Sequence, residues 1–449
     1  MAPIVSVLLL FAGFIHSTLA NVLPQCSHRA INELIPPTAT INYVRYVPRN
    51  SSFGDAAALG NATGLPEGCA IGINVLSSNT SSYNFALFLP NIWNSRFLAT
   101  GNGGYGGFTN WVYMGMFSQY GFATLSTDTG HISGIGDTSW ALNAPERVVD
   151  WGYRAMHGSV DLGKKVVQAY YGNRINYSYY AACSTGGRQG LKEVQEYPED
   201  FDGVLVAAPA WLLTRLPALA IQLANLNLPS DDPKHIPADM FSTITSEILK
   251  QCDGQDGVVD SIIMDPGSCR FRQESLLCTT RSSAADCLTP PQLKTLYRLL
   301  EDEIQVDQVS VLPALALGAD LSSTAGVTDA PMPMGIGFMQ NMVMNNTDWD
   351  WATYNLGDIQ LAEEVNPGNA TSDNYDLSAF RARGGKLIHL HGLADPTIPP
   401  GLSVYFRDQV QQTMNFSEAA LNQFYRMFLI PGLEHCFGST AAPCDDALG

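Results

Sequence analysis

Basic residues are scarce in this sequence, and one metal-site signature is missing from it. Lys and Arg total 24 against 42 Asp and Glu, so the formal net charge is −18. A protein this acidic repels nucleic-acid phosphates and anionic membrane surfaces, and neither is an expected partner. The nine cysteines include no CxxC pair, which argues against a zinc cluster.

Long hydrophobic runs are also missing, so we expect no membrane anchor. The N-terminal run from Val5 to Phe14 is too short to span a bilayer. Thr18 and Ala20 then place small residues at the two positions that signal peptidase reads, although the usual basic n-region is absent. We predict a signal peptide over residues 1–20, cleaved after Ala20. The alternative is a buried N-terminal strand or helix.

The residues that are present fit a folded, secreted protein. Hydrophobic residues make up 46% of the 449-residue chain, which is typical of a packed globular protein. In an oxidising compartment most of the nine cysteines pair, and one is left over because nine is odd. We expect an extracellular glycoprotein, because N-glycosylation sequons are dense for one chain. They occur at Asn50, Asn61, Asn79, Asn176, Asn345, Asn369 and Asn415.

Strand and helix patterns alternate along two parts of the chain, which indicates a parallel sheet. From about Trp211 to Phe380 this rhythm stops. We therefore predict an α/β core formed by residues 21–208 and 381–449. Residues 209–380 form an insertion, or lid domain, over the carboxyl ends of the strands, where α/β active sites lie. The predicted strands are Arg96–Thr100, Gly121–Thr127, Tyr177–Ala182, Gly203–Ala208, Lys386–Leu390 and Phe424–Ile430, and the predicted helices are Pro145–Tyr171 and one that begins at Arg188.

Ser184 lies in a turn between a predicted strand and a predicted helix. The segment Ala182–Gly186 fits a nucleophile elbow, a strand-to-helix turn that holds a serine in a strained, exposed position. Such a turn needs small neighbours because the nucleophile's backbone is cramped. Ala182 stands where the pattern usually has its first glycine, so the match is relaxed. An ordinary Ser-Thr-Gly-Gly turn before a helix is the alternative.

An acid and a histidine follow Ser184 in the order that α/β hydrolases use. Asp395 lies in the loop after the Lys386 strand, and His435 lies in the loop after the last strand. His435 would take the serine proton, while Asp395 would fix its tautomer and stabilise the imidazolium. Taken singly, Asp395 is more often a turn residue and His435 a surface residue.

Two cysteines flank the candidate nucleophile and base. Cys183 precedes Ser184, and Cys436 follows His435. A disulfide between them would hold their Cα atoms roughly 4.4–6.8 Å apart and would tether the nucleophile to the base. The alternative is that each cysteine pairs elsewhere.

These segments together resemble the tannase and feruloyl esterase family, whose members bridge the residues that flank the catalytic Ser and His. The resemblance implies an α/β-hydrolase fold with a large lid domain, and hydrolysis of esters of aromatic acids such as gallate, ferulate or p-coumarate. Family chains usually continue past the segment that ends here at Gly449, so the resemblance predicts a truncated form in which Cys444 lacks its partner. The segments that carry the likeness are Asp128–His131, Asp150–Arg154, Cys183–Gly190 and His391–Pro396.

A glycine cluster, Gly101–Gly106, follows the Arg96 strand and allows two interpretations. It matches the dinucleotide fingerprint G-x-G-x-x-G, with Asp128 about twenty residues on. Against a dinucleotide oxidoreductase, Phe108–Tyr113 reads as loop or strand rather than helix, and a secreted enzyme meets little NAD. In an esterase, such a loop binds the oxyanion through backbone N–H groups. We expect the donors to be Gly103 and Gly104, together with the N–H of Thr185.

An acidic loop lies inside the insertion. The resemblance implies a structural calcium ion held by the side chains of Asp253, Asp256 and Asp260 and by the carbonyls of Val258 and Ile262. Clustered carboxylates repel one another, which favours a bound cation over the alternative of a solvated acidic turn. Three further disulfides are expected to staple the N-terminal part and the insertion, namely Cys26–Cys69, Cys252–Cys269 and Cys278–Cys287.

Aromatic and methionine residues of the insertion could line an acyl pocket, but they more commonly form a core. They are Trp211, Phe338, Met339, Met342, Trp349 and Trp351, and we assign none of them to the site.

The sequence therefore predicts a secreted serine carboxylic-ester hydrolase. Its expected substrate is a small aromatic ester or a feruloylated polysaccharide fragment, and it is expected to be a monomer or a homodimer. A ferulate-type acid is favoured over gallate because the insertion lacks the dibasic processing site that fungal tannases often carry. The alternatives are a tannase and a catalytically dead, glycosylated binding protein on the same scaffold.

Overall fold

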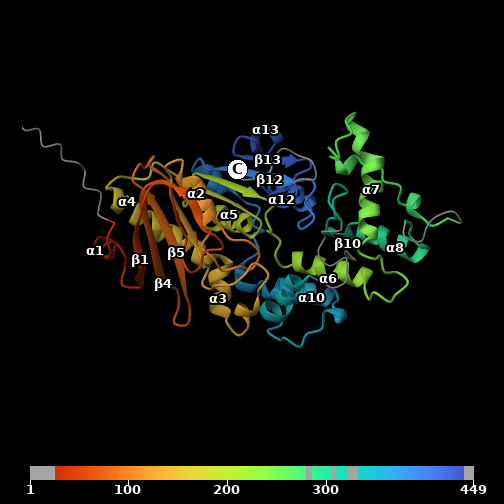
Figure 1. Cartoon of the computed structure of the whole chain (residues 1–449), viewed down its shortest axis with the longest axis horizontal. Coiled ribbons are helices and arrows are strands. Elements are labelled where there is room, and N and C mark those ends of the chain that lie inside the picture. The colour runs from red at the N-terminus through yellow and green to blue at the C-terminus, as the bar shows by residue number, and fades with distance from the viewer. Residues whose placement is uncertain (1–25, 280–285, 305–309, 322–331, 439–449) are drawn as a thin grey trace, which may run out of the picture.

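The computed structural model describes residues 26–279, 286–304, 310–321 and 332–438. The expected signal peptide and Cys444 lie outside these ranges. The described chain forms a large sheet with helices on both faces, and a helical insertion extends from one end of it (Figure 1).

The main sheet has nine strands in the order β1-β4-β5-β7-β6-β8-β9-β12-β13. From β7 to β13 neighbouring strands run parallel, while β1, β4 and β5 form an antiparallel extension at the other end. Each predicted strand is present, with ends that differ by one or two residues. The strands are β1 (Ala39–Val47), β4 (Gly68–Leu76), β5 (Ser82–Pro90), β6 (Arg96–Ala99), β7 (Ala123–Thr127), β8 (Tyr177–Cys183), β9 (Gly203–Ala207), β12 (Lys386–Gly392) and β13 (Tyr425–Ile430), and a small hairpin pairs β2 (Ser51–Phe53) with β3 (Ala62–Leu65).

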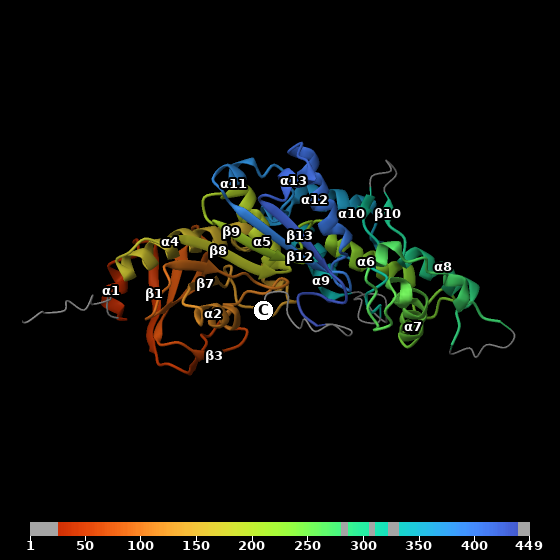
Figure 2. The ribbon, with the colours of Figure 1, turned by 90° about the horizontal axis from the view of Figure 1, so that it is seen from above.

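Side chains along β5 alternate between two cores, one on each face of the sheet. Leu87 belongs to the large core that includes Met156 of α4 (Ala155–Tyr171). Phe88 belongs to a smaller core with Trp111, the first residue of α2 (Trp111–Ser118). The sheet is thus a middle layer between helices, as Figure 2 shows from above. This arrangement is the predicted α/β-hydrolase architecture.

Three details of the helices differ from the predictions. The region Pro145–Tyr171 is helical throughout, but a π-helical turn, Asp150–Arg154, separates α3 (Pro145–Val149) from α4. The helix after Ser184, α5 (Thr185–Glu196), begins three residues earlier than expected. The expectation of loop or strand for Phe108–Tyr113 is wrong from Trp111 onward, because Asn110 caps the start of α2 there.

Carbonyl groups of the π-helical turn accept hydrogen bonds from a buried arginine, Arg188. Arg188 of α5 is fully buried and donates to the carbonyls of Trp151 and Gly152 in that turn. It also donates to the carbonyl of Ala370, where the insertion returns to the core. Burial lowers the pKa of Arg188 to about 10. A wide helical turn frees carbonyls for such an acceptor set, so this guanidinium ties α5 to two distant segments.

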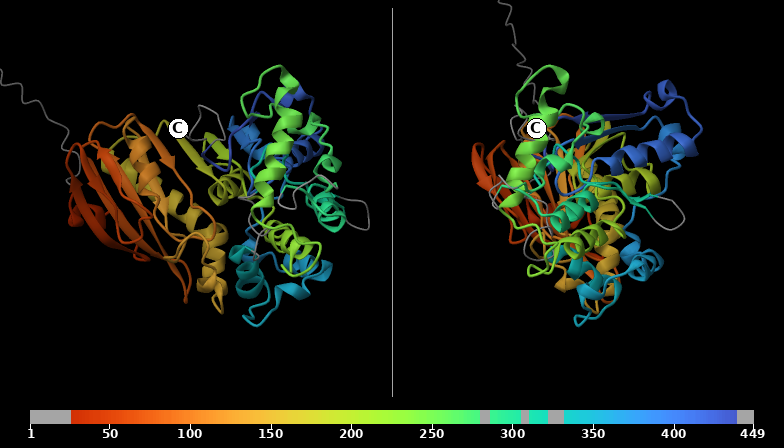
Figure 3. Two further views of the ribbon diagram at one scale, coloured as in Figure 1. Left: turned by 45° about the vertical axis from the view of Figure 1, so that its right-hand side comes forward. Right: turned by 90° about the vertical axis from the view of Figure 1, so that its right-hand side faces the viewer.

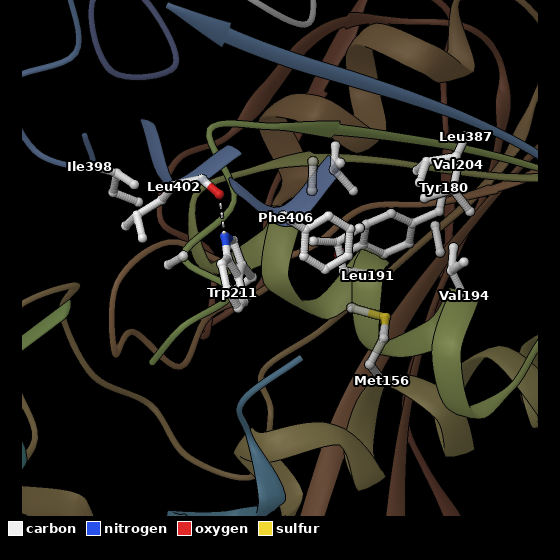
Figure 4. Close-up of a cluster of buried hydrophobic side chains, with 14 of the residues drawn as sticks. Met156, Tyr180, Leu191, Val194, Val204, Trp211, Leu387, Ile398, Leu402 and Phe406 are labelled. Atoms are coloured by element: carbon white, nitrogen blue, oxygen red, sulfur yellow. Dashed lines mark hydrogen bonds between the residues drawn. The ribbon is translucent and has the colours of Figure 1, made fainter. Parts of the chain in front are cut away.

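The insertion forms a helical unit beside the sheet, coloured green to cyan in Figures 1 and 3. Trp211 at its start packs into the main core, where its indole donates to the carbonyl of Leu402 (Figure 4). Phe338, Met339 and Met342 belong to a separate core, so the core interpretation of these residues is confirmed. The elements are α6 (Leu216–Asn227), α7 (Met240–Cys252), α8 (Pro290–Leu299), the pair β10 (Glu303–Ile304) and β11 (Ser310–Leu312), α9 (Pro333–Gly337) and α10 (Leu356–Val365). The chain then re-enters the core through α11 (Ser378–Ala382), β12, α12 (Gly401–Thr413), α13 (Glu418–Leu421) and β13.

A buried carboxyl on α5 gives the fold a pH dependence. Glu193 is 1% exposed. Burial, with the charge and the hydrogen bond of Asp200, raises the pKa of Glu193 well above its usual value. Burial opposes ionisation of Asp200, but His157 and Lys164 help to hold its pKa below the usual value. Glu193 therefore holds its proton more tightly in the folded protein than in the unfolded chain.

Replacing Glu193 with Gln should make the free energy of unfolding fall less steeply as the pH rises. The pKa of Glu193 is higher in the folded protein than in the unfolded chain. Its contribution to the free energy of unfolding is therefore fully present at a pH below the unfolded-state pKa, and it is lost as the pH rises through the folded-state pKa. Glutamine keeps a donor toward Asp200 and cannot ionise. Urea unfolding between about pH 5 and about pH 9 measures the difference. The exposed substitution Glu364→Gln is the control. Equal pH slopes in the wild type and Glu193→Gln would contradict this account.

Candidate active site

Four loops meet at the carboxyl ends of the parallel strands. The loop after β6 carries the glycine cluster, and β8 ends at Cys183, directly before Ser184. Asp395 follows β12, and His435 follows β13. These strands lie in the order β6-β8-β9-β12-β13. The topology therefore brings the predicted site residues to one edge of the sheet.

The backbone of Ser184 is strained in the way that an exposed nucleophile requires. Its φ is 61° and its ψ is −124°, a conformation that non-glycine residues rarely adopt. A Cβ added to Gly186 would lie 2.6 Å from the Cβ of Ala182. The turn therefore needs glycine at position 186 and a small residue at 182, and Ala182 meets this need in place of the usual glycine.

Ser184, His435 and Asp395 form one hydrogen-bonded line. Ser184 Oγ lies 2.9 Å from His435 Nε2, and His435 Nδ1 lies 2.7 Å from Asp395 Oδ2. An ionised Asp395 only accepts, so Nδ1 carries the imidazole proton and the Nε2 lone pair faces the serine hydroxyl. This is the arrangement in which a histidine can take a proton from a serine.

Asp395 is fully buried and nevertheless holds its charge. Burial opposes ionisation, but His435 and His391 outweigh it and hold the pKa of the carboxyl well below its usual value. The other carboxylate oxygen, Oδ1, accepts from the N–H groups of Thr397 at 2.8 Å and Ile398 at 2.9 Å. The carboxylate is thus ready to stabilise an imidazolium at His435.

The loops that carry Asp395 and His435 are joined along their backbones. Ala394 N–H donates to the carbonyl of Leu433 at 3.0 Å, and Leu393 N–H donates to that of Ile430 at 2.8 Å. A Cβ on Gly392 would lie 2.1 Å from the Leu433 carbonyl oxygen. Only glycine lets the two loops come this close.

A disulfide ties the nucleophile turn to the histidine loop. Cys183 and Cys436 are bonded, with their Cα atoms 5.8 Å apart across 253 residues of sequence. The structure also joins Cys26 to Cys69, Cys252 to Cys269 and Cys278 to Cys287. These are the four expected pairs.

Two of the three expected oxyanion donors lie beside Ser184. Gly104 and Thr185 line the same cavity as Ser184. Gly103 is next to them in the loop, and its carbonyl accepts from Gly106 N–H. Gln189 of α5 anchors this loop by accepting from Asn102 N–H at 3.1 Å. Because α2 follows the loop and leads into β7, the loop holds the position that supplies an oxyanion donor in α/β hydrolases.

Comparisons with known proteins agree with this geometry. The sequence profile described as tannase and feruloyl esterase matches residues 69–449. A probable feruloyl esterase B-1 of Aspergillus oryzae is 36% identical over 408 residues, which cover 89% of this chain and 75% of the relative. The chain belongs to the tannase and feruloyl esterase family. It is a carboxylic ester hydrolase, and the dinucleotide interpretation of the glycine loop is set aside.

Solved structures show the same fold. The crystal structure of feruloyl esterase B from Aspergillus oryzae superposes with a TM-score of 0.88 at 34% identity, covering 92% of this chain and 84% of that one. The tannin acyl hydrolase from Aspergillus niger superposes with a TM-score of 0.76 at 22% identity, covering 93% of this chain and 84% of that one. Of the helices that the structure describes, none has the length and apolar character needed to cross a bilayer.

An apolar cavity opens above the serine. The space between the lining residues is about 740 Å³, counted together with its opening to solvent. Ser184, Thr185 and Gly104 line it from the core of the esterase. The insertion supplies much of the opposite wall, including Leu216, Pro217 and Leu223 of α6 and Met334 of α9. None of the six aromatic and methionine residues singled out from the sequence is among the described lining residues.

The three carboxylates of the acidic loop each accept hydrogen bonds from the loop's own backbone. Asp253 accepts from the N–H groups of Asp260 and Ser261, so the loop folds around it. Asp256 and Asp260 each cap a local turn, at Val258 N–H and Ile262 N–H. One ion needs ligand atoms within about 4.8 Å of one another, and these three carboxylates are not among the described groups that meet this condition. The loop as described is not a preformed calcium cage.

His391 is a site residue to which the sequence assigned no role. Its Nε2 lies 3.2 Å from Asp395 Oδ2, so the buried acid faces two histidines. A signal was present in the sequence, because His389 and His391 alternate along a strand whose other residues after Lys386 are apolar. Period-two spacing places both on one face, and a buried polar group needs partners.

Removing the tether should cost activity more than it costs the fold. We expect the double variant Cys183→Ala/Cys436→Ala to lose on the order of tenfold to 100-fold in kcat, because His435 can then move away from Ser184. Steady-state kinetics on a methyl ester, with a melting curve, measure both effects. The control removes Cys278–Cys287 in the insertion and should keep its kcat. A double variant as fast as the wild type would show that the tether is dispensable.

Proposed function

We propose that this esterase releases hydroxycinnamic acids of the ferulate and p-coumarate type from plant cell-wall or polyphenol esters, with Ser184, His435 and Asp395 as its catalytic triad. The observation that carries the proposal is the hydrogen-bonded line from Ser184 Oγ to Asp395 at the floor of an apolar cavity. The relatives named as feruloyl esterases support the substrate class.

The geometry supports a two-step acyl transfer. Ser184 Oγ attacks the ester carbonyl as His435 Nε2 takes its proton, and the oxyanion accepts from Thr185 N–H and from the glycine loop. His435 then gives the proton to the departing alcohol, which leaves an acyl-serine. A water that loses its proton to His435 attacks the acyl-serine, releasing the acid and restoring Ser184. Asp395 holds the imidazole in its productive tautomer throughout.

The cavity walls favour a hydroxycinnamoyl group over a galloyl group. Among the described lining residues, the polar side chains are hydroxyls, at Tyr105, Ser184, Thr185 and Thr397, and the other side chains are apolar. A galloyl ring brings three vicinal phenolic hydroxyls that need partners once buried, whereas a feruloyl ring brings one hydroxyl and a methoxy group. The apolar walls fit the propenyl chain and the methoxy group, and tannase activity is the second candidate.

Replacing Ser184 with Ala tests the chemistry, and a substrate panel tests the specificity. We expect Ser184→Ala to lose on the order of 10⁶ in kcat with an unchanged melting curve, and a phosphonate inhibitor to label only the wild type. Methyl ferulate and methyl p-coumarate should turn over faster than methyl gallate. Faster gallate turnover would reassign the enzyme as a tannase. The absence of a Ser184 adduct would favour a dead binding protein.

Secretion and glycosylation are part of the same proposal. All seven sequon asparagines are solvent-exposed in the folded chain, where a glycan can be carried without unfolding. The four disulfides suit an oxidising compartment. An extracellular enzyme of this kind would meet feruloylated xylan, the polymer whose degradation it would assist, as a monomer or a homodimer.

We further propose that calcium binds the loop from Asp253 to Ile262 and draws Asp256 and Asp260 toward Asp253. The support is the repulsion among three carboxylates on one loop. Because this loop lies outside the catalytic line, chelation by EDTA should lower the melting temperature by several degrees while kcat at lower temperature stays nearly unchanged. Added Ca²⁺ should restore the melting temperature. The variant Asp256→Asn/Asp260→Asn is the control and should not respond. An unchanged wild-type melting curve would refute the ion.

A further inference from the structure

A chain of buried polar groups lies behind Asp395. His391 Nδ1 is 2.6 Å from Ser403 Oγ, and the same Oγ is 2.7 Å from His389 Nε2. His389 Nδ1 is 2.8 Å from the hydroxyl of Tyr425. All five groups, counting Asp395, are at most 1% exposed. The four groups behind Asp395 come from β12, from α12 and from the first residue of β13.

The partners at one end determine where the protons lie. His391 Nε2 faces two acceptors, the carboxylate of Asp395 at 3.2 Å and the carbonyl of Ile398 at 3.0 Å, so it must carry a proton. In a neutral His391, Nδ1 then accepts from the Ser403 hydroxyl. Ser403 Oγ in turn accepts from His389 Nε2–H, and His389 Nδ1 accepts from the Tyr425 hydroxyl. Every donor in the chain points toward Asp395.

If the hydrogen bonds of this chain ran in the opposite direction, the buried His391 would have to carry a positive charge. If Ser403 donated to His389 instead, His391 Nδ1 would also need a proton, and His391 would be an imidazolium. His389 does not share that charge, because burial and the neighbouring His391 lower the pKa of His389 to about 3. The neutral, one-directional chain satisfies all its members without that charge.

We infer that His391 is a positioning residue for the esterase reaction, held in its Nε2–H tautomer by the chain of Ser403, His389 and Tyr425 so that it fixes the Asp395 carboxylate. The inference rests on the triad proposed above. Asp395 Oδ2 is hydrogen-bonded to His435 Nδ1 and lies 3.2 Å from His391 Nε2, which also faces the Ile398 carbonyl, while Oδ1 accepts from two backbone N–H groups. With donors on both oxygens the carboxylate cannot rotate away from His435. In a buried site, aligned hydrogen bonds also strengthen one another.

Two substitutions at position 391 distinguish the effect of the Nε2–H donor from the effect of the space that the side chain fills. Glutamine places an amide nitrogen the same number of bonds from Cβ as imidazole Nε2, so His391→Gln keeps a donor toward Asp395. Methionine has a similar volume and no donor. We expect His391→Met to lose about 10- to 100-fold in kcat with little change in KM, and His391→Gln to stay within a few-fold of the wild type. Equal kcat in His391→Met and the wild type, at equal melting temperatures, would overturn the inference.

Histidine ¹⁵N resonances of the full-length wild type test the chain without any substitution. We expect His391 to be protonated at Nε2 and unprotonated at Nδ1 throughout the active pH range. A doubly protonated His391, or protonation at Nδ1 alone, would overturn the inference. In Tyr425→Phe, which removes the first donor of the chain, the resonances of both His389 and His391 should shift. An unmoved His391 would show that the chain does not reach Asp395.

The Ser184→Ala variant keeps the two proposals apart. If Ser184→Ala remains active, the triad assignment itself fails. If it is inactive while His391→Met works as well as the wild type, the triad stands and the positioning role of His391 is refuted.

Discussion

The contact between Ser184 Oγ and His435 Nε2, 2.9 Å long, joins residues 251 positions apart in the sequence, and the chemistry proposed for this esterase depends on it. Three separate constraints sustain it. The parallel strands end at one edge of the sheet, the strained turn at Ser184 exposes the hydroxyl, and the Cys183–Cys436 bond limits how far the two loops can separate. A reacting pair must be held to within fractions of an ångström, so several constraints on one contact are to be expected.

Polar groups in the interior are the second feature of this fold. Asp395, Arg188, Glu193 and the pair His389 and His391 are all buried, and each is compensated differently. Donors surround Asp395, backbone carbonyls accept from Arg188, and the raised pKa of Glu193 favours its neutral form. Burial is costly for each of these groups unless its partners are fixed. These buried polar groups therefore favour the one arrangement of strands and helices in which each of them has its partners.

The core and the insertion divide the work. Core loops carry the residues of the proposed triad and the proposed oxyanion donors, while the insertion supplies much of the wall that the acyl group would meet. Arg188 joins the two parts, because it lies on the helix behind Ser184 and donates to Ala370, where the insertion ends. Changes in the insertion can alter selectivity while the catalytic line stays intact.

The sequence by itself determined that Ser184, Asp395 and His435 follow strand ends, that the core is parallel and that a disulfide crosses the site, because the fold imposes an order of Ser, acid and His at strand ends that can be recognised locally. The contacts that exclude a Cβ at Gly186 and Gly392 are seen only in the folded chain, where another backbone or side chain comes too close. Tertiary structure alone decided the contact between the π-helical turn and Arg188, and the line from Tyr425 to Asp395. Each depends on distances between segments that are remote in the chain, and hydrophobic periodicity does not encode such distances.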